Sequence, residues 1–436
     1  MQTALRVERV DGVDGMARVR QPMATCNASS GAPSPFVDER FLRFYATHDE
    51  YFPAGAMRIR TYLARETCPG GRPDDDPVVG YLVLHHDFDR VIGPLHGGRL
   101  SFVATHDTDE GSITALIGRE DEVAKAIMNY LIEQERDWSL LEFVGQYDDA
   151  RLRTLAHQLA GPRLRIREIA IDPYSTLSLR WPTLASYYGD LSKRMRSNIS
   201  RQARKLYAVG CVELVFSRGC ATADLFDAHL DLEDRSWKRG TNAGLRRSPQ
   251  RTEYFRALCS GGAGVEPIYA GVVLDGVLIA GLLSIASGDR IWCLDMSFDE
   301  GFADVGPGQL PMLLTVGEAI DSGAVSVHFL QFFGYFKERW LAESRDAVNV
   351  QLIRRPSLFD TRALIGDARR RFGAEAPAVE RQLQEARRAK QHATTDAVHS
   401  RHLLGRYRST GALWARPEAE LRLPFPLNAL TGPSTR

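Results

Sequence analysis

The chain has 436 residues, and its 55 acidic side chains balance its 55 basic ones, so its formal net charge at pH 7 is zero. Chains longer than about 300 residues usually fold as more than one domain. A balanced charge argues against a general binder of polyanions such as DNA, so any contact with nucleic acid would need a local basic patch. The six cysteines are scattered, which predicts reduced thiols and no metal site.

The first 34 residues become rich in Gly, Ser, Ala and Pro towards their end, so we expect a disordered leader over residues 1–34. They lack the uninterrupted apolar core of a secretory signal. The longest apolar stretch, residues 268–286, is interrupted by Asp275 and Gly276. An Asp-Gly pair between two β-rich runs predicts a hairpin and not a membrane span. We therefore expect a cytoplasmic protein.

From residue 35 onward, the apolar pattern predicts a first α/β domain over residues 35–170. The expected elements, in chain order, are a helix over 37–48, strands over 57–64, 78–85 and 99–104, a helix over 120–136 and a strand over 138–144. Residues 146–182 contain no clear element of this series and are expected to link the first half to the second.

A second half over residues 171–355 is expected to repeat this architecture. Its predicted elements are a basic helix from residue 191, a strand over 212–217, helices over 224–238 and 251–258, the hairpin, a strand over 291–297, a helix after residue 308 and a strand over 325–330. Residues 356–436 should form a helical C-terminal extension, in which Pro377 could open a helix to about residue 390. We assign this extension no chemistry.

The turn Gly306-Pro307-Gly308, between a predicted strand and a predicted helix, indicates a ligand site. Glycines before a helix let backbone N–H groups approach an anion, and the helix dipole favours negative charge there. We therefore predict that Gly306, Gly308 and Gln309 hold the phosphates of a cofactor. The alternative is a turn that only reverses the chain.

Glu233 lies on the stripe of its predicted helix that should face the core. Phe226, Leu230, Glu233 and Trp237 follow one another at steps of four, three and four residues. A buried carboxylate either has a raised pKa or is held by a cation. Two interpretations stay open: an ion pair with the basic helix, or a general base that takes a proton from an attacking amine.

Four segments together resemble a known family. They are residues 193–205, 233–238, 272–280 and 335–340, and in this order they resemble the GNAT-like acyltransferases of the CelD/BcsL type, named for members linked to cellulose and exopolysaccharide synthesis. The resemblance is strongest over about 187–355 and weaker from residue 35 onward. The family is similar to the tandem Fem-type aminoacyl transferases. The resemblance implies an α/β fold with mixed sheets, built from two GNAT-like domains of which the first is degenerate.

The resemblance also implies a role for Tyr335-Phe336-Lys337. Lys337 matches the lysine of the family's Tyr-Lys signature, whereas the tyrosine is displaced by one residue to Tyr335. In a GNAT-like layout this segment lies over the gap that takes the thioester carbonyl. Lys337 would then stabilise an oxyanion or hold a carboxylate or phosphate of the substrate, with Tyr335 as a candidate acid. The alternative is a surface lysine.

Asp295 and His328 lie in the two strands that flank the predicted helix of this unit. A right-handed crossover makes the strands parallel. In a GNAT-like layout, which the resemblance implies, they part where the thioester lies, so the two side chains could face one another across the gap. An Asp-His pair would raise the basicity of the imidazole and offer a second proton acceptor. The alternative is a core histidine with backbone partners.

The basic helix carries six cations and almost no acids. They are Lys193, Arg194, Arg196, Arg201, Arg204 and Lys205. Their like charges lack the usual i to i+4 partners, which predicts either a solvated face or an anionic partner. That partner would be the phosphates of a cofactor, the surface of a polysaccharide synthase or the acceptor end of a tRNA. Candidate anion- and substrate-binding residues are Arg196, Arg201, Arg204, Trp237 and Lys238.

Residues and resemblance together predict an N-acyltransferase. It would move an acyl group from an acyl-CoA thioester to a small-molecule amine by direct attack in a ternary complex, without a metal, and a homodimer is one expected assembly. Two alternatives stay open. One is an aminoacyl-tRNA-dependent, amide-forming transferase of Fem type. The other is a non-catalytic binding module with the same fold in a biosynthetic assembly.

Overall fold

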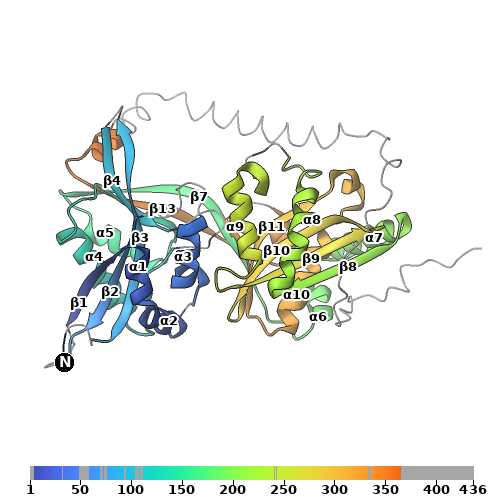
Figure 1. The fold of residues 1–436 in the computed structure, drawn as a ribbon, viewed down its shortest axis with the longest axis horizontal. Coiled ribbons are helices and arrows are strands. Elements are labelled where there is room, and N and C mark those ends of the chain that lie inside the picture. The colour runs from blue at the N-terminus through green and yellow to red at the C-terminus, as the bar shows by residue number, and fades with distance from the viewer. Residues whose placement is uncertain are drawn as a thin grey trace, which may run out of the picture.

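A computed structural model gives the fold of the chain (Figure 1). It describes residues 4–364 except for 32, 49–57, 69–71, 73–75, 93–94, 104–107, 109–110, 240, 242 and 332–334. The extension predicted to contain a helix over 377–390 lies outside the described residues. Within them, one 13-stranded mixed sheet runs through the molecule, and helices cover both of its faces.

The first half contains the helices and strands predicted for it, with shifted ends. Its elements are β1 (Leu5–Asp11), α1 (Gly12–Arg18), α2 (Arg20–Ala28), α3 (Glu39–His48), β2 (Arg58–Glu66), β3 (Val78–Ile92), β4 (Leu95–Phe102), β5 (Thr114–Ala115), α4 (Glu120–Glu133) and β6 (Leu140–Tyr147). The predicted helix over 37–48 begins only at Glu39, because a 3₁₀ turn over Pro35–Val37 precedes it.

The prediction of a disordered leader over residues 1–34 is wrong for the described residues. β1 pairs antiparallel with β2, from Leu5 opposite Glu66 to Asp11 opposite Arg60. The helices α1 and α2 bury apolar side chains such as Met16 and Met23 in the core. The small and turn-forming residues that suggested disorder belong to a short connection, which the side chain of Asn27 fastens by two hydrogen bonds to the backbone of Ser34.

The second half also follows the predicted order. Its elements are α6 (Leu184–Asp190), α7 (Lys193–Val209), β8 (Val212–Arg218), α8 (Ala223–Glu233), α9 (Pro249–Cys259), β9 (Glu266–Leu274), β10 (Val277–Ser287), β11 (Arg290–Phe298), α10 (Gln309–Asp321), β12 (Ser326–Gln331), α11 (Tyr335–Arg339) and β13 (Glu343–Arg354). The predicted hairpin is confirmed: Asp275 and Gly276 both have positive φ, 50° and 80°, as its two-residue turn requires.

The expected link over residues 146–182 is instead part of the sheet. It contains α5 (Arg151–Leu159) and β7 (Leu164–Ser178). β7 pairs antiparallel with β12 on one side and with β13 on the other, and β13 in turn pairs with β6. β13, the last strand of the described residues, therefore returns to the first half, and the two halves share the centre of one sheet.

The strand order reads alike from both edges of the sheet. One half runs β1-β2-β3-β4-β6-β13, and the other runs β8-β9-β10-β11-β12-β7. Each half has one parallel pair with three register pairs: β4 with β6, joined by α4, and β11 with β12, joined by α10. The predicted tandem α/β architecture is confirmed, and the two parallel pairs mark equivalent places in the two halves.

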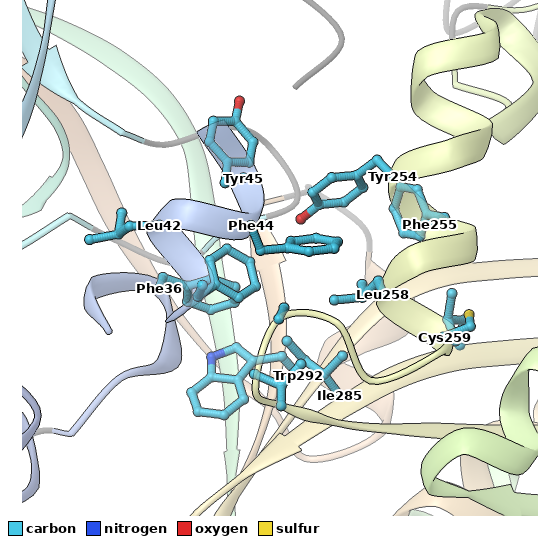
Figure 2. Close-up of a cluster of buried hydrophobic side chains, with 14 of the residues drawn as sticks. Phe36, Leu42, Phe44, Tyr45, Tyr254, Phe255, Leu258, Cys259, Ile285 and Trp292 are labelled. Atoms are coloured by element: carbon cyan, nitrogen blue, oxygen red, sulfur yellow. The ribbon is translucent and has the colours of Figure 1, made fainter. Parts of the chain in front are cut away.

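An apolar cluster fixes the two halves to each other (Figure 2). Phe36 of the first half packs edge-on against Trp292 of β11, with ring centroids 5.5 Å apart. Phe44 of α3 lies against Tyr254 of α9, at 5.3 Å. This cluster lies on the α8 and α9 face of the second half, while α6, α7 and α10 cover the opposite face. Among the described helices, none is long and apolar enough to cross a membrane.

Candidate active site

The strands β11 and β12 form a gap in the second half. They pair only from Arg290 opposite Ser326 to Trp292 opposite His328, although β11 continues to Phe298. Beyond Trp292, the edge of β11 that faces β12 has no register partner on that strand. The parallel pairing and the parting of these strands agree with the layout predicted from the sequence.

A bulge at Leu294 sets the direction of the next side chain on β11. Leu283 of β10 pairs with Asp295 and Ser284 pairs with Cys293, so Leu294 is an extra residue. In a regular strand, Trp292 and Asp295 would point to opposite faces, because they are three positions apart. The bulge puts both on the face covered by α8 and α9, at the edge of the gap.

Asp295 is the centre of a buried polar cluster on this face. Its carboxylate accepts from His229 Nε2 of α8 at 2.9 Å and from Lys238 Nζ at 2.5 Å. The other ring nitrogen of His229, Nδ1, lies 2.9 Å from the hydroxyl of Tyr269 on β9. A continuous chain of hydrogen bonds therefore joins β9, α8 and β11 beneath the gap.

Glu233 belongs to the same cluster. Lys238 Nζ donates to Glu233 Oε1 at 3.3 Å, and the backbone N–H of Leu245 donates to Oε2 at 2.6 Å. The expectation that Glu233 faces the core is confirmed, since its side chain is 3% exposed. Its cation comes from Lys238, five residues further along the chain, and not from the preceding basic helix. α8 ends at Glu233 rather than at residue 238, which lets the chain turn back.

The two carboxyl groups of the cluster have pKa values shifted in opposite directions. Burial and the nearby Asp295 carboxylate raise the pKa of Glu233, despite the Lys238 ammonium. Burial would also raise the pKa of Asp295, but the Lys238 ammonium and the hydrogen bond from His229 hold it well below its usual range. Opposite pKa shifts of this kind let one carboxylate stay ionised while its neighbour exchanges a proton.

His229, Glu233 and Asp295 are also close enough to hold a metal ion, since their ligand atoms lie within 4.8 Å of one another. The Lys238 ammonium, however, already contacts both carboxylates. A metal ion would have to displace it. The donor set therefore fits a metal poorly, and Lys238 serves as the cation of the cluster.

Two predictions for this region are wrong. Asp295 and His328 do not form a pair: His328 hydrogen-bonds Ser326 at 2.9 Å and stacks on Trp292, with ring centroids 5.1 Å apart. Asp295 lies three positions beyond Trp292 on β11, where the strands have parted. Its carboxylate accepts a hydrogen bond from His229 instead. Lys238, predicted to bind an anion of the substrate, is buried and held by two carboxylates, whereas Trp237 is 46% exposed.

Lys337 lies on the other face of the gap and is only 2% exposed, so the alternative of a surface lysine is wrong. Its Nζ donates to the backbone carbonyls of Phe329 at 2.9 Å and Leu330 at 3.2 Å. Burial lowers the pKa of Lys337 from 10.5 to about 8. Tyr335 begins α11, and its side chain lies outside what the structure describes.

The turn before α10 has the shape that an anion site needs. Gly306 adopts a left-handed conformation with φ 56°, and a Cβ there would lie 2.2 Å from Gln202 of α7. Among the described residues, no hydrogen-bond partner reaches the buried Oε1 atoms of Gln202 and Gln309, so each oxygen is left to accept from a ligand or from water. The N–H of Gly306 donates to the carbonyl of Ala303 and that of Gln309 to the carbonyl of Gly306 at 3.5 Å, so in the described part of the chain Gly308 is the predicted donor whose N–H has no backbone partner.

The two equivalent helices, α10 and α4, differ in the charge of their first turns. The first turn of α10 has no acidic residue. The first turn of α4, its counterpart in the first half, has three, which are Glu120, Asp121 and Glu122. Carboxylates at a helix N-terminus compete with an anionic ligand for the same N–H groups. Of these two helix starts, the one in the second half therefore repels an anionic ligand less.

The arginines predicted to bind an anion on α7 differ in their surroundings. Arg196 donates to the backbone carbonyls of Gly189 and Leu191 and so fastens α7 to the end of α6. Arg201 and Arg204 are exposed and bond only within the helix, to Asn198 and Ser200. In the described part of the chain, no carboxylate forms an ion pair with either of them. These two remain candidates for an anionic partner.

His229 and Tyr269 are the members of the cluster that the sequence analysis missed. His229 stands four residues before Glu233, so it lies on the same face of α8. This four-residue spacing could have been used to predict that His229 lies beside Glu233. Tyr269 carried none, because an aromatic residue in a buried hairpin strand is ordinarily a core residue.

Comparison with known proteins finds a family match within the second half. Residues 193–337 match the family model described as "Acetyltransferase (GNAT) domain". No curated protein matches the chain significantly. FemX, a solved structure, matches with 12% identity over 76% of this chain and 95% of its own, at a TM-score of 0.50.

Two further solved structures match at lower TM-scores. A conserved protein of unknown function from Bacteroides thetaiotaomicron VPI-5482 has 10% identity over 77% of this chain and 97% of its own, at 0.47. A tandem GNAT protein from the clavulanic acid biosynthesis pathway has 16% identity over 81% of this chain and all of its own, at 0.44. Residues 193–337 thus resemble a GNAT acetyltransferase domain, FemX shares the fold, and the CelD/BcsL assignment stays a prediction.

Proposed function

We propose that this protein is an N-acyltransferase that transfers an acyl group from an acyl-CoA thioester to the nitrogen of a small-molecule amine. The observation that carries the proposal is the gap between β11 and β12, with the anion-suited start of α10 on one face and the buried carboxylates on the other. A diphosphate-bearing thioester and an amine would approach the gap from opposite faces.

The donor's phosphates would lie at the start of α10. The N–H of Gly308 and the side-chain NH2 groups of Gln202 and Gln309 would bind them, because these donors belong to the turn or, in the case of Gln202, lie against Gly306 within it. The thioester would then extend into the gap. There the main-chain groups of β11 beyond Trp292 would bind its carbonyl and the oxyanion that forms from it.

The amine would attack the carbonyl carbon directly. The new C–N bond forms, the C–S bond breaks, and the sulfur leaves as a thiolate. Glu233, whose pKa is raised, would take the proton that the amine loses and release it to the thiolate or to solvent. Asp295 stays ionised and holds Lys238 and His229 in place, so it would keep the relay aligned without changing its own charge.

Binding of the donor tests the proposal against its two alternatives. Titration of the purified protein with CoA, followed by the shift in melting temperature, should give stabilisation that grows with concentration as mass action requires. An aminoacyl-tRNA-dependent enzyme should ignore CoA and bind tRNA with a steep dependence on salt. A binding module without catalysis should respond to neither. Absence of any CoA effect at millimolar concentration would refute the acyl-CoA proposal.

A further inference from the structure

β12 carries an irregular segment just beyond the last pair that it forms with β11. On the other side of β12, His328 pairs with Thr176 of β7 and Gln331 pairs with Tyr174, so that two residues of β12 stand opposite one of β7. These two are Phe329 and Leu330. Leu330 has φ 53°, a left-handed conformation that costs a non-glycine residue about 1 kcal/mol or more.

The ammonium of Lys337 is bound to this irregular segment. It donates to the carbonyls of both residues, at 2.9 and 3.2 Å, and is buried. Its charge also acts on the thiol of Cys293, the β11 residue next to the last paired one. The ammonium therefore lies where the two strands begin to part, bound to β12 and close to β11.

Backbone carbonyls that are buried need a hydrogen-bond partner. On a strand that has just left its neighbour, the nearest alternative partners are the N–H groups of that neighbour. The Lys337 ammonium already donates to the carbonyls of Phe329 and Leu330. These carbonyls therefore do not need the N–H groups of β11, and β12 is not drawn to pair further along that strand. The left-handed Leu330 shows that the backbone is held in a conformation that it would not adopt by itself.

We propose that Lys337 is a positioning residue, whose ammonium caps the carbonyls of β12 and keeps the gap between β11 and β12 open for the donor thioester. The proposal rests on the proposed acyl-CoA site. It assigns Lys337 to the shape of the site, in place of the oxyanion-stabilising role expected from the sequence.

The two roles differ in their effect on donor binding. A group that stabilises only the oxyanion acts in the transition state, so its removal lowers turnover and leaves the dissociation constant of the donor unchanged. A group that shapes the gap is needed before the reaction begins. Its removal should weaken binding of CoA itself, which contains no carbonyl to form an oxyanion at the reacting sulfur.

The test compares Lys337→Met, which keeps the length of the side chain without its charge, with Lys337→Arg, which keeps the donors. Tyr187→Phe is the matched control: it removes a buried hydrogen bond to the backbone carbonyl of Trp340, just after α11, and leaves the Lys337 ammonium in place. Two readouts are used, the dissociation constant of CoA by calorimetry and amide hydrogen exchange of peptides covering residues 293–298 and 326–331, measured without ligand.

We expect Lys337→Met to raise the dissociation constant of CoA at least tenfold and to change exchange in both peptides, while Lys337→Arg restores part of each effect and Tyr187→Phe changes neither. A Lys337→Met protein with unchanged CoA affinity and unchanged exchange would overturn the proposal, whatever its turnover. If the wild type does not bind CoA, the acyl-CoA function is refuted. The exchange readout then still decides whether Lys337 holds the strands apart.

Discussion

The ammonium of Lys238 lies 2.5 Å from the carboxylate of Asp295, and both side chains are buried. The same ammonium reaches Glu233 at 3.3 Å. One cation therefore serves two carboxylates, which keeps the charge of the cluster partly unbalanced. This imbalance is the physical reason that the two carboxyl groups differ in pKa, and it makes Lys238 the group on which the others depend.

Removal of this cation should destabilise the fold strongly. Lys238→Met leaves the two buried carboxyl groups without their ammonium, with His229 and Ser297 beside Asp295 and the Leu245 N–H beside Glu233. Breaking a buried ion pair on one side typically costs about 3–5 kcal/mol. Urea denaturation of the variant and the wild type measures the loss. Arg246→Met, which removes an exposed ion pair with Asp231 from the same region, is the control and should change stability by well under about 1 kcal/mol. Equal effects of both substitutions would contradict the role of Lys238.

Replacement of Glu233 should affect turnover more than folding. Glu233→Gln keeps the shape of the side chain but cannot accept a proton, so we expect turnover to fall about a hundredfold. Steady-state release of free thiol from an acyl-CoA measures it, once an amine acceptor is supplied. Asp231→Asn, an exposed carboxylate on the same helix, should keep full activity. Full turnover in Glu233→Gln would exclude Glu233 as the base.

The lowered pKa of Lys337 predicts a specific dependence of stability on pH. In the folded protein the pKa is about 8, and in the unfolded chain it returns to 10.5. Between these pH values the unfolded state binds more protons, so the stability of the folded state rises with pH across this window. The free energy of unfolding of the wild type, relative to Lys337→Met, should therefore increase by at most about 3 kcal/mol from pH 7.5 to 10.5. A flat difference would place the ammonium in a more solvated site.

Two neighbouring cations of α7, Lys205 and Arg204, can be used to test which side of the helix faces the donor site. Gln202 contacts Gly306; Lys205 is about 60° from Gln202 around the helix and Arg204 about 160°. Lys205→Glu should weaken CoA binding several-fold at low salt and less at high salt, because screening already reduces the attraction. Arg204→Glu should have little effect. If Lys205→Glu and Arg204→Glu change the affinity for CoA equally at every ionic strength, this side of α7 is a solvated face.

Much of the second half could be predicted from sequence, because its signals are local. The Asp275-Gly276 turn requires positive φ at both positions, and the glycines at 306 and 308 mark the start of α10. β7 was missed for the opposite reason. Its apolar residues alternate with charged ones, and its partners β12 and β13 come from more than 140 residues further along the chain, so nothing local indicates that it is central.

The candidate site was predicted only in part, for the same reason. The helical spacing correctly placed Glu233 in the core. The turn that brings Lys238 back to Glu233, and the bulge at Leu294 that points Asp295 toward α8, both depend on tertiary contacts and leave no pattern in the sequence. A regular strand in place of that bulge would point Asp295 to the opposite face, away from His229.

The start of α10 provides the most direct test of the central claim, that this helix holds the phosphates of a CoA donor. Gly308 has ordinary helical angles, φ −65° and ψ −13°, and a Cβ there would meet only Phe298 at 3.6 Å, so it can be replaced without strain. Gly308→Asp introduces a carboxylate of the kind that α4 carries, and Gly308→Asn introduces the same shape without charge. Calorimetric titration should show CoA binding weakened at least about tenfold more by Asp than by Asn, since the carboxylate repels the phosphates at close range. Equal affinity of both variants for CoA would contradict the account.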